Sequence, residues 1–230
     1  ATASMDGKTC VVTGATSVIG RATALGRAAQ GARLVLLCRD RARGDGLLRE
    51  IRSRTGRDAA VVVLADLSRQ AEIRRAAEEI LAAAPRIDVL LNNAGIVNVR
   101  RELTADGLEA TFAVNHLGYF LLTRLLLDRL KESAPSRIVN VASDANRFRG
   151  FDLDDLQFER RRYSWTAAYG QSKLCNVLFT RALAKRLEGT GVTVNALHPG
   201  GVATGLAQNN GWWAVWITKL VRPFLRSPEK

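Results

Sequence analysis

Six short apolar segments alternate with helix-like segments along the chain, and this alternation constrains the fold more than any other feature. We expect strands at residues 8–13, 33–38, 60–64, 87–91, 137–142 and 191–197. We expect helices at 21–30, 42–54, 70–84, 105–130, with a break near Asn115, and 167–187. Strands that alternate with helices form parallel sheets covered on both faces. The sequence therefore predicts one α/β domain over residues 1–230, with a doubly wound parallel sheet.

The unusual loops all follow predicted strands. Ligands of such sheets bind in a crevice at the carboxyl ends of the strands. We therefore expect a single ligand site where these loops meet. They contain Gly14 to Gly20, Arg39, Asp66, Asn92 to Gly95, Ser143, and Pro199 with Gly200.

The first of these loops joins a strand to a helix and contains two glycines. Strand, glycine-rich turn and helix are the context in which a glycine pattern predicts dinucleotide binding, because the helix start offers free N–H groups to a pyrophosphate. Val18 stands where the middle glycine of that pattern is expected, so a plain βα turn stays open as an alternative. In a Rossmann-like domain the cofactor would contact Gly14, Thr16, Ser17, Val18, Ile19 and Gly20.

The second predicted strand ends in Arg39 and Asp40. This position faces the adenosine ribose of a dinucleotide, where an acidic residue binds the 2′-hydroxyl of NAD and a basic residue accommodates the 2′-phosphate of NADP. Because Arg39 comes first, NADP(H) is favoured and NAD(H) is the second choice. The alternative is that Arg39 is one more solvated surface arginine.

Tyr169 and Lys173 are four residues apart early in the last predicted helix. Such residues lie on one helix face, one turn apart. A phenol ionises near pH 10, and a neighbouring positive charge lowers that pKa. The pair could therefore act as a general acid or base on an alcohol or carbonyl oxygen. A surface tyrosine beside a solvated lysine is the alternative.

Composition narrows the class of protein. The net charge is +12 and 47% of the residues are hydrophobic. No aromatic residues interleave with the arginine clusters, so we expect no nucleic acid partner. With no apolar run of 18 residues and no signal-like start, a cytoplasmic location is expected. Cys10, Cys38 and Cys175 are expected to be reduced core residues, with no metal bound.

The chain resembles the short-chain dehydrogenase/reductase family over about residues 7 to 206, and finer stretches such as Val114 to Gly118 and Val177 to Thr180 resemble its retinol dehydrogenase-like branch. The motifs that carry the resemblance are Thr13-Gly14-x-x-x-Val18-x-Gly20, Asp66-Leu67, Asn92-Asn93-Ala94-Gly95, Asn115, Ser143, Tyr169-x-x-x-Lys173 and Pro199-Gly200.

The resemblance implies a catalytic tetrad of Asn115, Ser143, Tyr169 and Lys173. In that family the tyrosine exchanges the proton and the serine binds the same oxygen. The lysine lowers the tyrosine pKa and holds the nicotinamide ribose, while the asparagine positions a water that links the lysine to solvent. The resemblance also implies cofactor contacts from Asp66, Leu67, Asn93, Ala94, Gly95, Pro199, Gly200, Val202 and Thr204.

The C-terminal tail, residues 203–230, is expected to cover a lipophilic alcohol or carbonyl substrate. Its Trp212, Trp213 and Trp216 would equally suit a peripheral membrane contact. The family often forms homodimers through the helices at 105–130 and 167–187. His198 is expected to pack rather than catalyse, and His116 receives no chemical role.

Two other functions compete with an oxidoreductase. The first is a nucleotide-binding or scaffolding protein that keeps the fold without catalysis, which Val18 favours. The second is a membrane-peripheral binding protein that uses the tryptophan-rich tail. Turnover of NADPH with lipophilic carbonyls separates the oxidoreductase from both.

Overall fold

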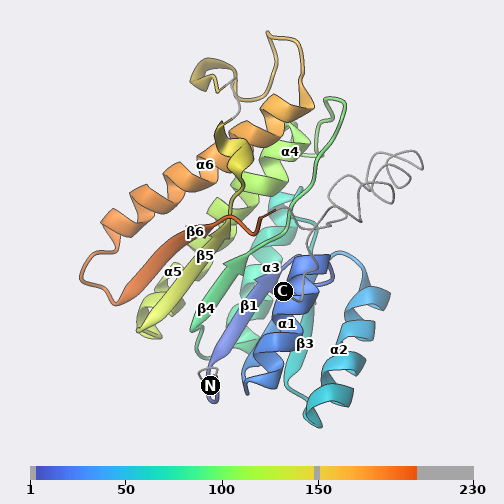
Figure 1. The fold of residues 1–230 in the computed structure, drawn as a ribbon, viewed down its shortest axis with the longest axis vertical. Coiled ribbons are helices and arrows are strands. Elements are labelled where there is room, and N and C mark those ends of the chain that lie inside the picture. Colours follow the sequence, from blue (N-terminus) through green and yellow to red (C-terminus); the bar gives the residue numbers. More distant parts are fainter. Residues whose placement is uncertain (1–3, 148–150, 201–230) are drawn as a thin grey trace.

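The computed structural model describes residues 4–147 and 151–200 (Figure 1). Over these residues the chain forms a six-stranded sheet in the order β3-β2-β1-β4-β5-β6, and every pairing is parallel. This is the doubly wound Rossmann-like sheet expected from the sequence. The strands are β1 (Thr9–Thr13), β2 (Arg33–Cys38), β3 (Ala60–Leu64), β4 (Val89–Asn92), β5 (Ser136–Val141) and β6 (Val192–Leu197).

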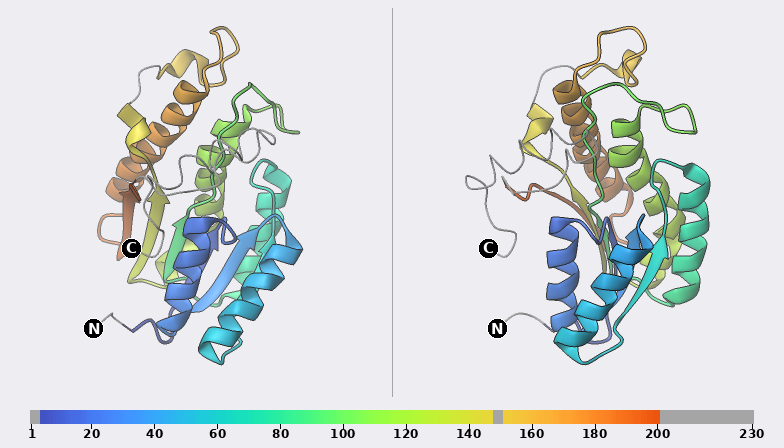
Figure 2. Two further views of the ribbon diagram at one scale, coloured as in Figure 1. Left: turned by 45° about the vertical axis from the view of Figure 1, so that its right-hand side comes forward. Right: turned by 90° about the vertical axis from the view of Figure 1, so that its right-hand side faces the viewer.

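Helices cover both faces of the sheet because alternate strand residues are buried on opposite sides (Figure 2). On one side, Cys10 and Val12 of β1 belong to a core shared with α1 and α2. On the other side, Val11 belongs to a core shared with α3, α5 and the end of α6. The helices are α1 (Val18–Ala29), α2 (Arg41–Thr55), α3 (Gln70–Ala83), α4 (Ala110–Phe112), α5 (Gly118–Glu132) and α6 (Trp165–Arg186).

The helix predicted at 105–130 begins later than expected. Leu103 pairs with Glu109 in an antiparallel bridge, and the Glu109 carboxylate then caps α4 by accepting hydrogen bonds from Thr111 N and Phe112 N. The expected break near Asn115 is a π-helical turn, η1 (Ala113–Leu117), between α4 and α5. Such turns are rare and frequently lie at functional sites.

The last helix begins earlier than expected, at Trp165, because the Ser164 side chain caps it by accepting a hydrogen bond from Ala167 N. Two short 3₁₀ turns, η2 (Asp144–Arg147) and η3 (Leu153–Asp155), precede it. The segment that leads into α6 is held in place: Tyr163 Oη donates to Asn98 O at 2.9 Å, and Arg161 Nη2 donates to Gln171 Oε1 at 2.6 Å.

The continuous helical stretch Ala110–Glu132 is long and apolar enough to cross a membrane by length and composition alone. The most apolar 18-residue window of this stretch is 61% buried inside the domain. Leu122, Leu126 and Leu130 are fully buried in the core shared with α3. Its apolar character is therefore explained by packing within this domain.

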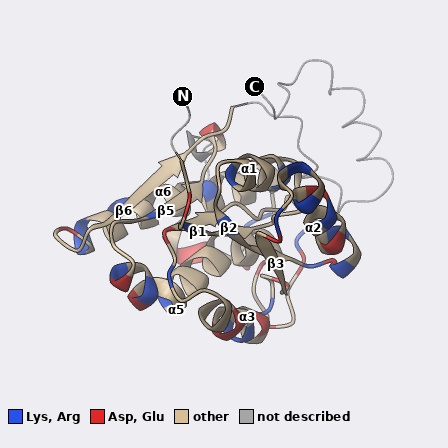
Figure 3. Cartoon of the chain, turned by 90° about the horizontal axis from the view of Figure 1, so that it is seen from below, with Lys and Arg blue, Asp and Glu red and all other residues tan. Residues whose placement is uncertain are grey.

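Acidic and basic residues both lie on the outward faces of α2 and α3 (Figure 3). Arg54 pairs with Glu50 at 2.8 Å on α2, and Arg75 pairs with Glu79 on α3. Such exposed pairs contribute about 1 kcal/mol or less each. Part of the arginine content is thus surface ion pairing.

Candidate active site

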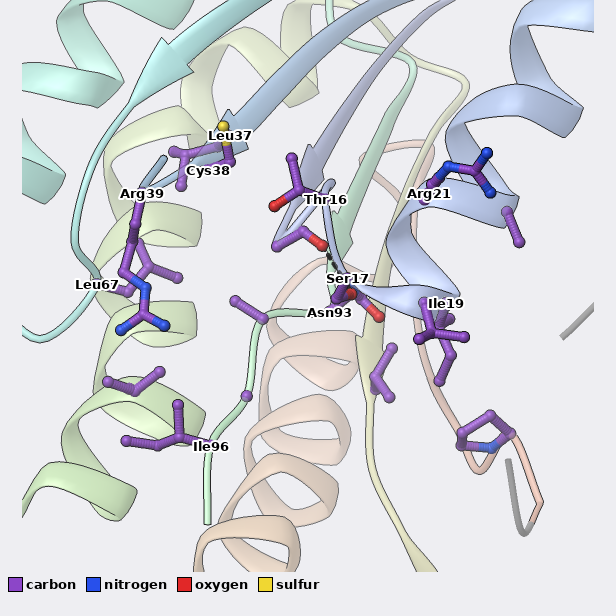
Figure 4. Close-up of a pocket in the computed structure, with 18 of the residues that line it drawn as sticks. Thr16, Ser17, Ile19, Arg21, Leu37, Cys38, Arg39, Leu67, Asn93 and Ile96 are labelled. Carbon is purple, nitrogen blue, oxygen red and sulfur yellow. Dashed lines mark hydrogen bonds between the residues drawn. The ribbon is translucent and has the colours of Figure 1, made fainter. Parts of the chain in front are cut away.

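A cavity of about 1080 Å³ lies at the carboxyl ends of the strands (Figure 4). The loops expected to form a ligand site all contribute to its wall. Asn115 does not line it, and Val202 and Thr204 lie outside the described residues. The predicted site residues in the wall are Gly14, Thr16, Ser17, Val18, Ile19, Gly95, Arg39, Asp66, Leu67, Asn93, Ala94, Ser143, Tyr169, Lys173, Pro199 and Gly200.

Two glycines shape the turn that follows β1. Gly14 has φ +61°, a left-handed conformation that favours glycine, and a Cβ there would lie 2.8 Å from Ala94 Cα. Gly20 is buried, and a Cβ there would lie 2.3 Å from Gly14 O. Both glycines are therefore required by the contact between the turn, the start of α1 and the loop after β4. Gly20 does not line the cavity itself.

Thr13 and Asn93 join this turn to the loop after β4. Thr13 Oγ1 accepts hydrogen bonds from Asn93 N at 2.9 Å and Ala94 N at 3.0 Å. Asn93 Nδ2 donates to Thr13 O at 2.9 Å and Ser17 Oγ at 3.2 Å. Sequence reasoning placed Thr13 at a strand end and in the glycine motif of the family, but assigned it no role in the site. Its signal was a hydroxyl at the end of an otherwise apolar strand, directly before a glycine.

Val18 is the first residue of α1, and Phe158 is the one non-glycine residue with positive φ among those described. Val18 therefore does not have the positive φ that would favour glycine at this position. Ser17 caps the helix, its Oγ accepting from Gly20 N at 3.3 Å. Val18 lines the cavity at the start of α1.

Replacing Val18 with glycine is expected to tighten NADPH binding several-fold, or about 1 kcal/mol, because two methyl groups leave the anion site. A calorimetric titration of both forms measures this. Ala22→Gly in the next turn of α1, which also lines the cavity, is the matched control for lost helix propensity. Unchanged or weaker binding by the Val18→Gly protein would contradict the expectation.

At the end of β2, the two charged residues have different roles. Asp40 caps α2, its Oδ1 accepting from Arg43 N at 3.1 Å. The Arg39 side chain lies beside the cavity opposite Thr16 (Figure 4). Arg43 also lines the cavity, and its Nη2 donates to Thr16 O at 2.9 Å. The Asp40 carboxylate therefore supports the helix start, while Arg39 and Arg43 are two of the arginines that line the cavity.

Lys173 is buried beside the cavity, with 2% of its surface exposed. Its Nζ donates to Val141 O at 2.9 Å and lies 5.6 Å from the centre of the Tyr169 ring. Burial lowers the pKa of Lys173 to about 8. The ammonium is thus held close to the phenol, as their spacing on one helix face predicted.

Tyr169 differs from the expectation in one respect. Burial raises its pKa, and a hydrogen bond with Ser143 opposes that rise in part. The expected net lowering of the Tyr169 pKa is therefore wrong for this structure, because desolvation of the phenolate outweighs the favourable effects on it. A phenol with a raised pKa stays protonated at neutral pH and can donate its proton to a carbonyl oxygen.

Asn115 is fully buried and does not line the cavity, although its neighbour Val114 does. Its Oδ1 accepts from Ile96 N at 2.8 Å. Its Nδ2 donates to Ile96 O at 3.0 Å and Ser172 Oγ at 3.1 Å. The side chain thus joins the loop after β4 to α6, at the residue before Lys173, and its role in positioning a water stays a prediction.

His198 was expected to pack, and that expectation is wrong. Its Nε2 lies 3.0 Å from Asp144 Oδ2, its side chain is 36% exposed, and it lines the cavity. The contact links Asp144, which follows Ser143, to His198, which precedes Pro199. His198 is therefore part of the cavity wall that sequence reasoning missed.

Comparison with known proteins matches the short chain dehydrogenase family model to residues 8–214. The chain belongs to the short-chain dehydrogenase family. It is 47% identical to human retinol dehydrogenase 13 over 91% of its length, and spans 63% of that protein. It is 46% identical to mouse retinol dehydrogenase 12, covering 97% of this chain and 70% of that one.

Among solved structures, a short-chain dehydrogenase from Sphingobium yanoikuyae in complex with NADPH is 29% identical and has a TM-score of 0.72. The match covers 86% of this chain and 73% of that chain. The identity to retinol dehydrogenases 12 and 13 confirms the retinol dehydrogenase-like branch expected from the motifs.

The predicted tail, residues 203–230 with its three tryptophans, lies outside the described residues.

Proposed function

We propose that the protein is an NADP(H)-dependent oxidoreductase that interconverts an alcohol and a carbonyl on a lipophilic small molecule. One observation carries this proposal: Tyr169, Ser143 and Lys173 meet in the same cavity that contains the glycine turn and Arg39. The names of its retinol dehydrogenase relatives support a lipophilic alcohol as the substrate class.

The cavity fits a dinucleotide. A Cβ at Gly14 would fill part of the turn, the start of α1 offers backbone N–H groups, and guanidinium groups lie at the end of β2. Gly14, Thr16, Ser17, Val18 and Ile19 would hold the pyrophosphate. When bound, the nicotinamide supplies or accepts a hydride at the substrate carbon.

The proton is handled by the residues of the chain. In the reductive direction the Tyr169 hydroxyl donates its proton to the substrate oxygen, and the Ser143 hydroxyl binds the same oxygen. The Lys173 ammonium, held by Val141 O, stabilises the phenolate that results. Asn115 keeps α6 and the loop after β4 in register through Ser172 and Ile96.

The test is NADPH oxidation at 340 nm with a panel of lipophilic ketones and aldehydes, with polar sugars as the comparison set. Turnover of the lipophilic members supports the proposal. NADPH binding without turnover of any carbonyl or alcohol would instead support a non-catalytic nucleotide-binding protein.

Arg39→Asp is expected to lower NADPH affinity at least tenfold and to erase the preference over NADH, because a charge-assisted contact with the 2′-phosphate is replaced by repulsion. Dissociation constants of both cofactors measure this. Arg41→Asp, on the first turn of α2, is the matched control for the change in net charge. Equal affinity of the parent protein for both cofactors would contradict the preference.

A homodimer, a peripheral membrane contact and a cytoplasmic location stay predictions. Light scattering of the purified chain tests the first of them. Sedimentation with anionic and neutral liposomes tests the second.

A further inference from the structure

A hydrogen-bonded pair, fully buried Asn176 and partly buried His116, contacts the main chain of Asn115. Asn176, fully buried on α6, donates from Nδ2 to the main-chain oxygen of Asn115 at 2.8 Å. Its Oδ1 lies 3.0 Å from Nδ1 of His116. Neither His116 nor Asn176 lines the cavity, and the mechanism above uses neither of them.

The Asn115 carbonyl determines the orientation of this pair. A carbonyl oxygen only accepts hydrogen bonds, so the group that Asn176 presents to it must be the amide NH₂. The Asn176 oxygen then faces His116, and His116 Nδ1 must carry a proton to donate to it. The three groups thus form one directed chain from the imidazole to the π-helical turn at Asn115.

The imidazole is held by aromatic packing as well as by this hydrogen bond. Its ring centre lies 5.4 Å from that of Phe112 and 6.1 Å from that of Phe179. Phe112 precedes the π-helical turn, and Phe179 lies on α6. The ring is therefore wedged between the two elements that carry Asn115 and the Tyr169–Lys173 pair.

Asn176 also belongs to the same helix face as the catalytic residues. It follows Tyr169 by seven residues and Lys173 by three, the spacing of a single face of a helix. One face of α6 thus carries the Tyr169 phenol, the Lys173 ammonium and the Asn176 amide that donates a hydrogen bond to Asn115 O. The side chain of Asn115 in turn reaches Ser172, whose Oγ donates to Tyr169 O at 2.7 Å.

We propose that His116 and Asn176 are positioning residues that hold the main chain of Asn115 at the π-helical turn, and through it the Tyr169–Lys173 pair. The inference rests on the proposed function. With the pair in place, the main chain of Asn115 is hydrogen-bonded by Asn176, and its side chain is hydrogen-bonded to Ile96 and Ser172. Without it, the turn that carries Asn115 can shift relative to α6, and small misplacements of catalytic groups cost up to about 10²-fold in rate.

The first test uses two substitutions at His116. His116→Phe keeps an aromatic ring between Phe112 and Phe179 but removes the Nδ1 donor. His116→Asn places an amide NH₂ near the position of Nδ1. We expect kcat to fall about tenfold in the phenylalanine variant and to recover most of that loss in the asparagine variant. KM for the carbonyl and Kd for NADPH should stay within about twofold.

The second test uses Asn176→Leu, which keeps the volume and removes both polar ends. Its loss in kcat should equal that of the double variant with His116→Phe, because the two residues act through one contact. Thr123→Val is the structural control: Thr123 is buried and accepts from Asn92 Nδ2 at 3.0 Å, away from Asn115. It should lower thermal stability and leave kcat unchanged.

The outcomes separate the two proposals. A wild-type protein that binds NADPH but turns over no alcohol or carbonyl overturns the proposed function, and this inference with it. An active wild type whose His116→Phe variant retains full kcat overturns the positioning role alone. ¹⁵N NMR of the imidazole should show a protonated Nδ1 and an unprotonated Nε2, and the reverse tautomer would also overturn the inference.

Discussion

Tyr169→Phe is expected to lower kcat by at least about 10² to 10⁴, the range that general acid–base groups contribute. The substitution removes the proton donor and keeps the ring that lies near the Lys173 ammonium. The proposed pyrophosphate contacts come from the loop after β1, so Kd for NADPH should change little. Steady-state turnover of a responsive carbonyl, together with a fluorescence titration of NADPH, measures both quantities.

Tyr163→Phe is the matched control for this loss. Tyr163 is partly buried, and its hydroxyl donates to Asn98 O, outside the cavity. Its removal should lower stability modestly and leave kcat within a few-fold of the parent value. If the Tyr169 variant turned over as fast as wild type, the acid would have to be another residue.

Lys173→Met is expected to abolish most turnover and to stabilise the fold at neutral pH. Burial lowers the lysine pKa from 10.5 to about 8, which corresponds to about 3 kcal/mol of unfavourable free energy while the amine is charged. Methionine removes that cost but leaves Val141 O without its donor, which offsets about 1 kcal/mol. Chemical denaturation at pH 7 should therefore show a net gain of roughly 2 kcal/mol.

The stability difference between the methionine variant and the wild type depends on pH. Below pH 8 the amine is charged in both the folded and unfolded states, so the full cost of burial applies to the wild type. Between pH 8 and 10.5 the folded protein releases the proton first, and the stability of the wild type rises with pH. The advantage of the methionine variant should shrink across this window and reverse to a deficit of about 1 kcal/mol above it, because the neutral amine still donates to Val141 O.

Lys185→Met on the exposed side of α6 is the control for this experiment, because its side chain is solvated. It should change stability by a few tenths of a kcal/mol at most and show no such window. A Lys173→Met protein that is less stable than wild type at pH 7 would show that the lysine is better solvated than its burial indicates.

Much of the fold could be predicted from the sequence because its strands are apolar runs that end in distinctive loops. The loops at Gly14, Arg39, Asn93 and Ser143 were expected to converge since parallel strands present their carboxyl ends to one edge. Two helices begin at residues other than those predicted because the side chains that cap them, Glu109 and Ser164, were not recognised as caps. The Glu109 carboxylate caps α4 after an antiparallel bridge, and nothing in the local pattern distinguishes that glutamate from a helical one.

The energetics of the site were harder to predict than its location. The spacing of Tyr169 and Lys173 indicates proximity, but the direction of the phenol pKa depends on how deeply both are buried, which is a property of the assembled domain. The same holds for Asn115. Its bonds to Ile96 and Ser172 join segments that are far apart in the chain, so its side chain could not be placed beforehand.

The close approach of Gly20 to Gly14 has a consequence for mutational scanning of the cofactor loop. A side chain at Gly20 collides with Gly14 O before any ligand arrives, since the added Cβ would lie 2.3 Å away. Failure of a Gly20 variant to bind NADPH would thus report misfolding of the turn, not a lost contact. Val18 and Thr16 line the cavity and meet no such constraint, so a change in NADPH affinity on substitution there reports on the ligand site itself.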